Sequence, residues 1–248
     1  MPINWFKYSA PASFYPLAGR LIPWCYGAAL LLVALGLYWG FARTPDVLAE
    51  QREYYRIIFV HVPAAWLSMW LYLVLAAWGV AGLVFRTRLS FMMAAATAPT
   101  GALFTFLALW TGAFWGRTSW GAWWDWDPRL TSELILLFLY VGYMALHAAI
   151  DDPQRAGKAS ALLALTGLVA LPVIYWSVNC PDPSQCSALH QRSSLKQIEP
   201  NILFAMLVMS LSFWLWSFAV IFQRVRTLIL ERERDTDWAR TLIAGESA

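Results

Sequence analysis

Three histidines are the side chains of this 248-residue chain best suited to bind a metal-containing ligand. His61 lies within a long uncharged stretch, where an ionisable residue is costly and marks either a functional site inside a helix bundle or a hydrogen-bonded core histidine. His190 lies in a polar segment, where a histidine alone means little. Two neutral imidazoles can fill both axial positions of a haem iron, but they are too few for a closed structural zinc site.

The second candidate is a tryptophan-rich segment, residues 120–131, with the sequence WGAWWDWDPRLT. The spacing of Trp120, Trp123 and Trp124 predicts a short interfacial helix with three indole rings on one face. Such a wall of rings suits a large, planar, apolar ligand. It is equally what an aromatic belt at the lipid–water boundary supplies.

Two further residues of this segment have a structural and a chemical interpretation. Asp127 followed by Pro128 is a strong helix-start signal, which accounts for the carboxylate without any chemistry. Arg129, one turn into the helix and beside the indoles, is suited to pair with a ligand carboxylate. Its side chain is also suited to reach toward lipid headgroups, which is the competing interpretation.

The cysteines do not indicate self-attachment of haem, because the chain has no Cys-x-x-Cys-His sequence. Cys180 and Cys186 lie in the segment that precedes His190, and on an oxidising side of a membrane they are suited to form a disulfide that closes a small loop. A catalytic thiol pair is the less favoured alternative. Cys25 is expected to be buried as a small apolar residue.

The amino-acid composition indicates what kind of protein carries these residues. The chain is 60% hydrophobic and only 13% charged, with 16 Trp, 10 Tyr and 14 Phe. In soluble domains about a quarter of the residues are charged, so the low charged fraction excludes a soluble protein. The high hydrophobic fraction excludes a disordered one. The net charge of +3 is small and spread out, which speaks against a nucleic-acid-binding protein. An integral membrane protein remains.

Long windows without Asp, Glu, Lys or Arg predict six transmembrane helices in one all-α membrane domain that covers residues 1–248. The expected spans are residues 22–42, 57–85, 91–115, 132–150, 159–178 and 201–222. The first window is too long, and lacks the basic start, for a cleaved signal peptide. Pro63, Pro99 and Pro172 fall inside spans, where they are expected to be tolerated as kinks.

Basic residues are more numerous on the side that carries both ends of the chain, so the positive-inside rule places both termini in the cytoplasm. Residues 43–56, 116–131 and 179–200 then face outward, and residues 223–248 form a cytoplasmic tail, expected to be a solvated helix that extends the last span. This topology brings His61, His190 and the tryptophan segment to one face. His147 falls on the other side and is expected to play no part.

The run WGAWWDWDPRLT, which continues as SELILLFLYVGY, closely resembles the tryptophan-rich "WWD" signature of a superfamily of haem-handling membrane proteins. Within that superfamily, the six spans and the segments YRIIFVHVPAAW (55–66) and LHQ (189–191) resemble the cytochrome c maturation protein C (CcmC) family. The resemblance extends over about residues 20–230. The cysteine-containing loop before His190 departs from the usual family pattern.

The resemblance implies a haem-binding protein of the bacterial inner membrane that presents haem b, iron-protoporphyrin IX, to the periplasmic haem chaperone CcmE. It implies that His61 and His190 are the axial ligands, and that CcmA, CcmB and CcmD act beside the protein. The residues that it assigns to the haem platform are Trp120, Trp123, Trp124, Trp126 and Asp127, with Arg129 at the edge.

Two other classes of protein compete with a haem-delivery protein that is not an enzyme. A membrane-anchor subunit of a respiratory oxidoreductase also binds haem b through two histidines, but its ligands usually lie on spans, whereas His190 lies in a loop. A membrane-embedded transferase needs a catalytic acid or base, and Asp125 and Asp127 are the only carboxylates at hand near the tryptophans.

Overall fold

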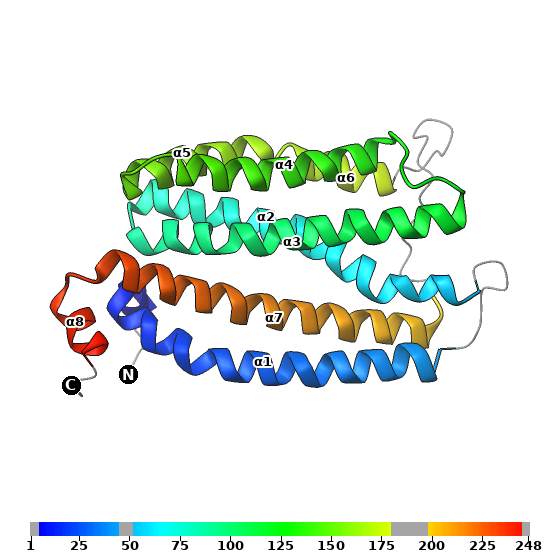
Figure 1. Cartoon of the computed structure of the whole chain (residues 1–248), viewed down its shortest axis with the longest axis horizontal. Helices are drawn as coiled ribbons and strands as arrows, with labels where there is room; N and C mark the ends of the chain where they lie inside the picture. The colour runs from blue at the N-terminus through cyan, green and yellow to red at the C-terminus, as the bar shows by residue number, and fades with distance from the viewer. Residues whose placement is uncertain (1–4, 45–51, 180–197, 245–248) are drawn as a thin grey trace.

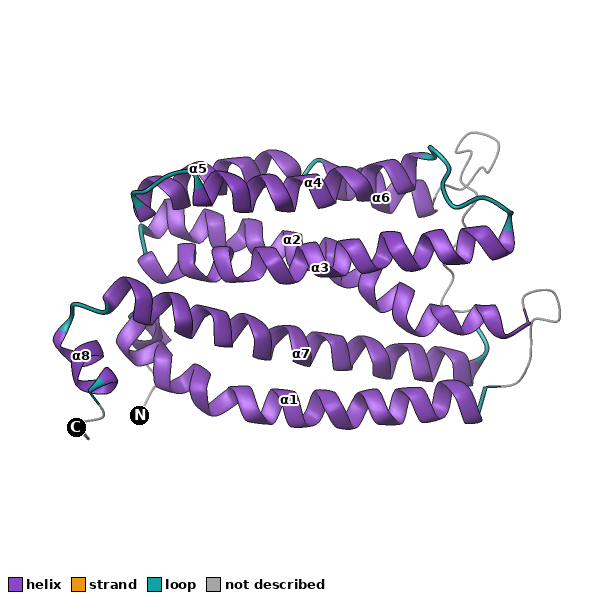
Figure 2. Cartoon of the chain, viewed as in Figure 1, coloured by secondary structure: helices purple, strands orange, loops and turns teal. Residues whose placement is uncertain are grey.

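The computed structural model describes residues 5–44, 52–179 and 198–244. Within these ranges the chain is helical with short connections and has no strand (Figure 2). The helices are α1 (Pro11–Ala42), α2 (Ile58–Phe85), α3 (Arg88–Ser119), α4 (Pro128–Ala148), α5 (Pro153–Gly167), α6 (Ala170–Asn179), α7 (Pro200–Glu233) and α8 (Asp237–Ile243). Two short 3₁₀ helices, η1 (Trp5–Ser9) and η2 (Arg52–Ile57), precede α1 and α2.

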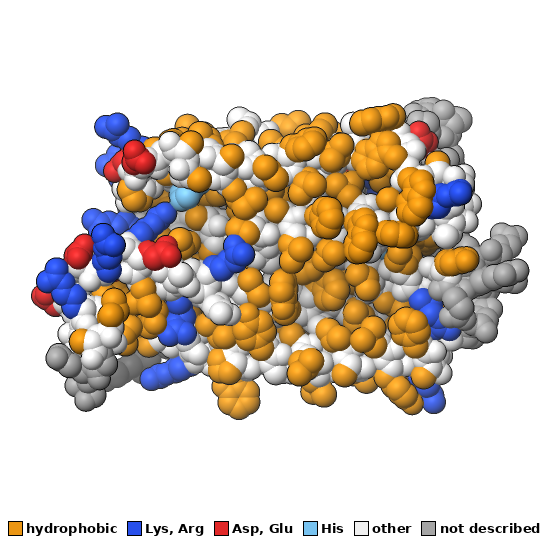
Figure 3. Space-filling model, in the orientation of Figure 1, with side chains coloured by type: hydrophobic (Ala, Val, Ile, Leu, Met, Phe, Trp, Pro, Cys, Tyr) orange, Lys and Arg blue, Asp and Glu red, His pale blue; other side chains and the backbone are white. Residues whose placement is uncertain are grey.

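Six helical stretches are long and apolar enough to cross a membrane. Five are α1, α2 with the end of η2, α3, α4 and α7, and the sixth is α5 together with α6, over Pro153–Trp176. The predicted all-α membrane protein with six transmembrane helices is therefore confirmed. Figure 3 shows the expected surface, with apolar side chains over the middle of the molecule and charged ones mainly toward its ends.

Proline residues set several helix boundaries. Four helices, α1, α4, α5 and α7, have proline as their first residue, where its missing N–H costs nothing. Pro172 lies in the first turn of α6, just after the break that separates α6 from α5. Pro172 cannot donate to the carbonyl of Leu168, four residues earlier, so one helical hydrogen bond is lost at this interruption. In contrast, α2 and α3 continue through Pro63 and Pro99.

The helices pack as two groups (Figure 1). Helix α1 runs along α7, and α2 packs on α3, with α4, α5 and α6 on the far side of that pair. Small residues allow close approach, since a Cβ on Gly36 would lie 2.7 Å from the Met209 side chain and one on Gly40 would lie 2.8 Å from Phe59. Helix α1 begins, and α8 lies, at the same end of the bundle.

The last membrane-spanning helix, α7, extends beyond the predicted span. Helix α7 continues to Glu233, as the charge pattern after Phe222 indicated. However, it is not solvated on all sides, because Val225 and Ile229 are fully buried against α2 and α3. Helix α8 then folds back, so that the Trp238 ring lies 6.0 Å from the ring of Tyr15. Apolar side chains between the charged residues of the tail, such as Val225, Ile229 and Trp238, explain why this part of the chain packs on the bundle.

Candidate functional site

His61 lies in the first turn of α2, where it is 5% exposed. Its Nδ1 atom lies 3.0 Å from the Thr111 hydroxyl on α3. The Trp115 ring meets the imidazole edge-on, with 5.6 Å between ring centroids. Gly112 lies beside the imidazole, and a Cβ at that position would be 3.0 Å from Cε1. The imidazole is thus held against one face of α3.

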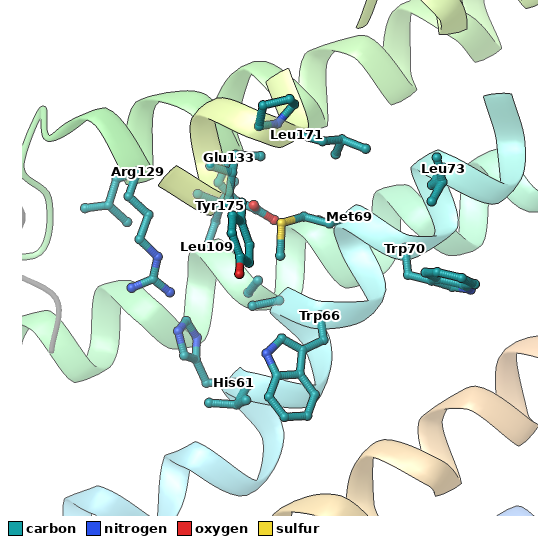
Figure 4. Close-up of a pocket in the computed structure, with 16 residues that line it drawn as sticks. His61, Trp66, Met69, Trp70, Leu73, Leu109, Arg129, Glu133, Leu171 and Tyr175 are labelled. Atoms are coloured by element: carbon teal, nitrogen blue, oxygen red, sulfur yellow. The ribbon is translucent and has the colours of Figure 1, made fainter. Parts of the chain in front are cut away.

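A cavity of about 770 Å³ opens beside His61 (Figure 4). This volume is in the range of sites for small molecules and cofactors. Most lining residues are apolar, and the charged groups on its wall are Arg129 and Glu133. The other lining residues are Val62, Ala65, Trp66, Met69, Trp70 and Leu73 of α2, Ala108 and Leu109 of α3, Leu130 of α4, and Leu171, Pro172, Ile174 and Tyr175 of α6.

Arg129 enters this cavity because the N-cap of α4, Asp127, lies two residues earlier. The Asp127 carboxylate is buried and accepts a hydrogen bond from the Leu130 N–H at 2.7 Å, which confirms the predicted helix cap. With the helix fixed at this register, the Arg129 side chain points across the cavity toward His61. The structure therefore brings together two of the residues selected from the sequence.

Glu133 is a site residue that the sequence analysis missed. It lies one turn after Arg129 on α4, is 7% exposed, and lines the same cavity. Its Oε1 atom has no hydrogen-bond partner among the described residues. An ionisable residue at the end of an apolar window is itself a signal for a functional position, but in the sequence Glu133 served only to mark where that window ends.

The predicted interfacial helix at Trp120–Trp124 is wrong. Helix α3 ends at Ser119, and Gly121 has a positive φ of 83°, which a glycine adopts without strain and which stops the helix. The Asp127 cap starts the next helix only a few residues later, so residues 120–127 have no room for a regular helix. The indole rings consequently do not share one helical face.

The tryptophans instead make separate contacts at the end of the bundle where α3 meets α4. Trp120 packs on Gly116, Trp123 meets Phe114 edge-on at 5.2 Å, and Trp124 meets Trp126 at 5.4 Å. Trp123 and Trp126 are 54% and 74% exposed. None of these four tryptophans lines the cavity beside His61. Trp115 connects the two regions, since it contacts His61 and precedes the segment along the chain.

Three candidates from the sequence, His190, Cys180 and Cys186, lie outside the described residues. His147 lies near the opposite end of α4 from Arg129. Its ring stacks on Tyr143, and its Nε2 atom lies 3.1 Å from the Arg232 guanidinium.

The fold and the site define a class: a multi-pass membrane protein in which an imidazole and a guanidinium face one largely apolar cavity. The family model described as Heme exporter protein C (CcmC) matches residues 4–240. The chain belongs to this family.

Relatives in several bacteria agree with this assignment. Heme exporter protein C of Escherichia coli K12 is 42% identical over 239 residues, which cover 96% of this chain and 95% of the relative. The protein of that name from Bradyrhizobium diazoefficiens is 42% identical over 222 residues, with 90% and 84% covered. The one from Haemophilus influenzae is 38% identical over 243 residues, with 95% of each chain covered.

Proposed function

We propose that this chain binds haem b between the cavity beside His61 and the tryptophan segment, and presents it to the periplasmic haem chaperone CcmE. Its family membership supports a role in haem export for the biogenesis of c-type cytochromes, as a membrane protein. The observation that carries the finer proposal is that His61 and Arg129, from two different helices, face one apolar cavity (Figure 4).

The residues fit the chemistry of haem. A haem offers an iron that takes axial imidazole ligands, a flat apolar ring and two carboxylates. His61 supplies an imidazole at the cavity wall, and its Nδ1 atom lies beside the Thr111 hydroxyl. Arg129 supplies a guanidinium that can bind a propionate through two parallel hydrogen bonds. Under this proposal His190 is the second axial ligand.

The tryptophan segment has a separate role in the proposal. Trp120, Trp123, Trp124 and Trp126 offer indole surface for the part of the porphyrin that projects from the cavity. Trp124 adds a buried Nε1–H group without a hydrogen-bond partner among the described residues. Asp127 contributes by capping α4, which positions Arg129.

We further propose that the protein lies in the bacterial inner membrane with both termini in the cytoplasm, beside CcmA, CcmB and CcmD. The end of the bundle that carries residues 120–127 then faces the periplasm. An edge of the porphyrin left open there would meet CcmE. Holding haem and CcmE in the correct relative orientation would supply much of the acceleration of the reaction between them. This is the role of a binding and delivery protein, not of an enzyme.

The visible spectrum of the purified protein tests the site. Membrane-extracted wild-type protein should carry haem with a bis-histidine spectrum. His61→Ala and His190→Ala should each change that spectrum, and the double variant should lose haem. His147→Ala is the matched control, because this histidine lies at the other end of α4, and it should keep the wild-type spectrum. Unchanged haem in the double variant would remove both residues from the site.

A further inference from the structure

The hydrogen bond between His61 and Thr111 has a defined direction. Threonine has one hydroxyl proton. In α3 the Thr111 hydroxyl donates this proton to the Leu107 carbonyl at 2.5 Å, the usual bond of a helical threonine to the preceding turn. The alternative acceptor, the Ala108 carbonyl at 3.4 Å, also belongs to the backbone. Carbonyls only accept, so in either case the hydroxyl proton is not available to His61.

Since its proton is used in this way, Thr111 faces His61 only as an acceptor. The Nδ1 atom of His61, 3.0 Å away, must then be the nitrogen that carries the proton. In a neutral imidazole the other nitrogen, Nε2, holds the lone pair. Contacts with Trp115 and Gly112 restrict rotation of the same ring, so both its tautomer and its orientation are set by α3.

We infer that Thr111 is a positioning residue, which fixes the Nδ1–H tautomer of His61 and thereby leaves Nε2 as the nitrogen that binds iron. The inference rests on the proposed function for its link to haem, whereas the tautomer itself follows from the hydrogen bonds. Metal-bound histidines generally donate their second N–H to an acceptor, which makes them more basic ligands. Here a threonine, whose own proton is engaged within its helix, serves as that acceptor.

The tautomer can be measured without haem. A variant with His147→Gln and His190→Gln keeps His61 as its one histidine, and ¹⁵N NMR of the labelled, haem-free protein at alkaline pH distinguishes the two neutral tautomers. We expect the Nδ1–H form. Thr111→Val, which keeps the shape and removes the acceptor, should shift the ring toward the Nε2–H form, and Thr111→Ser should restore Nδ1–H.

Thr105→Val is the matched control. Thr105 is fully buried on the same helix and makes the same bond to the preceding turn, to Gly101, at 2.8 Å, but no contact with His61 involves it. This variant should leave the tautomer unchanged. An Nε2–H ring in the single-histidine protein, or a Thr111→Val variant that keeps Nδ1–H, would overturn the inference whatever the protein binds.

The haem-loaded protein tests the second half of the inference. Without the Thr111 acceptor, His61 is a weaker electron donor and stabilises ferric iron less. Thr111→Val should therefore raise the reduction potential of the haem, and Thr111→Ser should restore the wild-type potential. A changed tautomer with an unchanged potential would overturn the positioning role. In that case the spectrum of His61→Ala shows whether the proposed function fails as well: an unaltered spectrum would mean that His61 is not a ligand.

Discussion

At the scale of single residues, the site depends on polar groups placed in an apolar wall. His61 and Glu133 are both more than nine-tenths buried, and Arg129 faces the same cavity. Burying such groups is costly unless they have partners or serve a ligand. His61 has Thr111 as a partner, whereas Glu133 Oε1 has none among the described residues. The unpaired Glu133 oxygen beside the cavity supports the proposal that a ligand binds there.

The first prediction concerns the Arg129 guanidinium. Arg129→Gln should lower haem affinity about ten- to a hundredfold, because a hydrogen bond to a charged group contributes roughly 1.5–3 kcal/mol. The haem affinity of Arg129→Lys should lie between those of the wild type and Arg129→Gln, since an ammonium keeps the positive charge but lacks the planar pair of donors of a guanidinium. Haem titration followed by absorption in lipid nanodiscs measures the affinity. Arg155→Gln, at the exposed start of α5, is the control. Wild-type affinity in Arg129→Gln would exclude a propionate contact.

At the scale of the elements, the junction between α3 and α4 connects the tryptophan segment to the cavity. Gly121 allows the backbone to leave α3, and Asp127 with Pro128 starts α4. Between them the chain carries Trp123, Trp124 and Trp126 in a non-helical segment. Arg129 lies in the first turn of α4, so its position depends on how firmly that turn is capped.

The second prediction separates the cap from the charge of Asp127. Asp127→Ala should cost about 1 kcal/mol of stability, the usual loss of a helix cap, and should weaken haem binding by disordering the first turn. Asp127→Asn should keep both, because asparagine caps equally well. Thermal unfolding and haem retention are the two measurements.

The control for this prediction is Asp152→Ala. Asp152 caps α5 with the same geometry, accepting from the Arg155 N–H at 2.7 Å, but at the other end of the bundle. This variant should lose stability and keep haem. If Asp127→Asn were as stable as the wild type but lost haem, the negative charge itself would be required, and capping would not be a sufficient account of this residue.

At the scale of the whole molecule, the bundle presents different chemistry at its two ends. One end has α8, the start of α1 and most of the charged side chains in Figure 3. The other has residues 120–127 and the cavity beside His61. The proposed delivery role requires this polarity, because the ligand must be held where a partner in one compartment can reach it.

The third prediction tests this orientation. In a background with Cys25, Cys180 and Cys186 replaced by serine, Ser119→Cys should react with a membrane-impermeant maleimide in intact spheroplasts. Asp151→Cys should react only after permeabilisation, because the positive-inside rule predicts that this end, with its excess of basic residues, lies in the cytoplasm. Both positions are exposed and lie beyond opposite ends of α4. The reverse pattern would place the tryptophan segment in the cytoplasm and exclude delivery to a periplasmic chaperone.

The transmembrane helices of this protein could be predicted from the amino-acid sequence alone. Runs of apolar residues without charge are long enough to span a bilayer only as helices, so six spans could be counted directly. Local chemistry also sufficed for the Asp127 cap, because capping involves a side chain and a backbone group three residues apart. Likewise, His61 and Arg129 could be selected individually, since charged and ionisable groups are rare in such segments.

Which of these residues meet could not be predicted, because that depends on how the helices pack. The spacing of the tryptophans predicted a helix, but Gly121 and the nearby Asp127 cap end and restart helices within too few residues for one to form. Glu133 gained its meaning when α4 turned it toward the cavity. Thr111 lies 50 residues from His61 and looks like any buried helical threonine in the sequence. Contacts between helices depend on packing across the whole bundle, which no local pattern encodes.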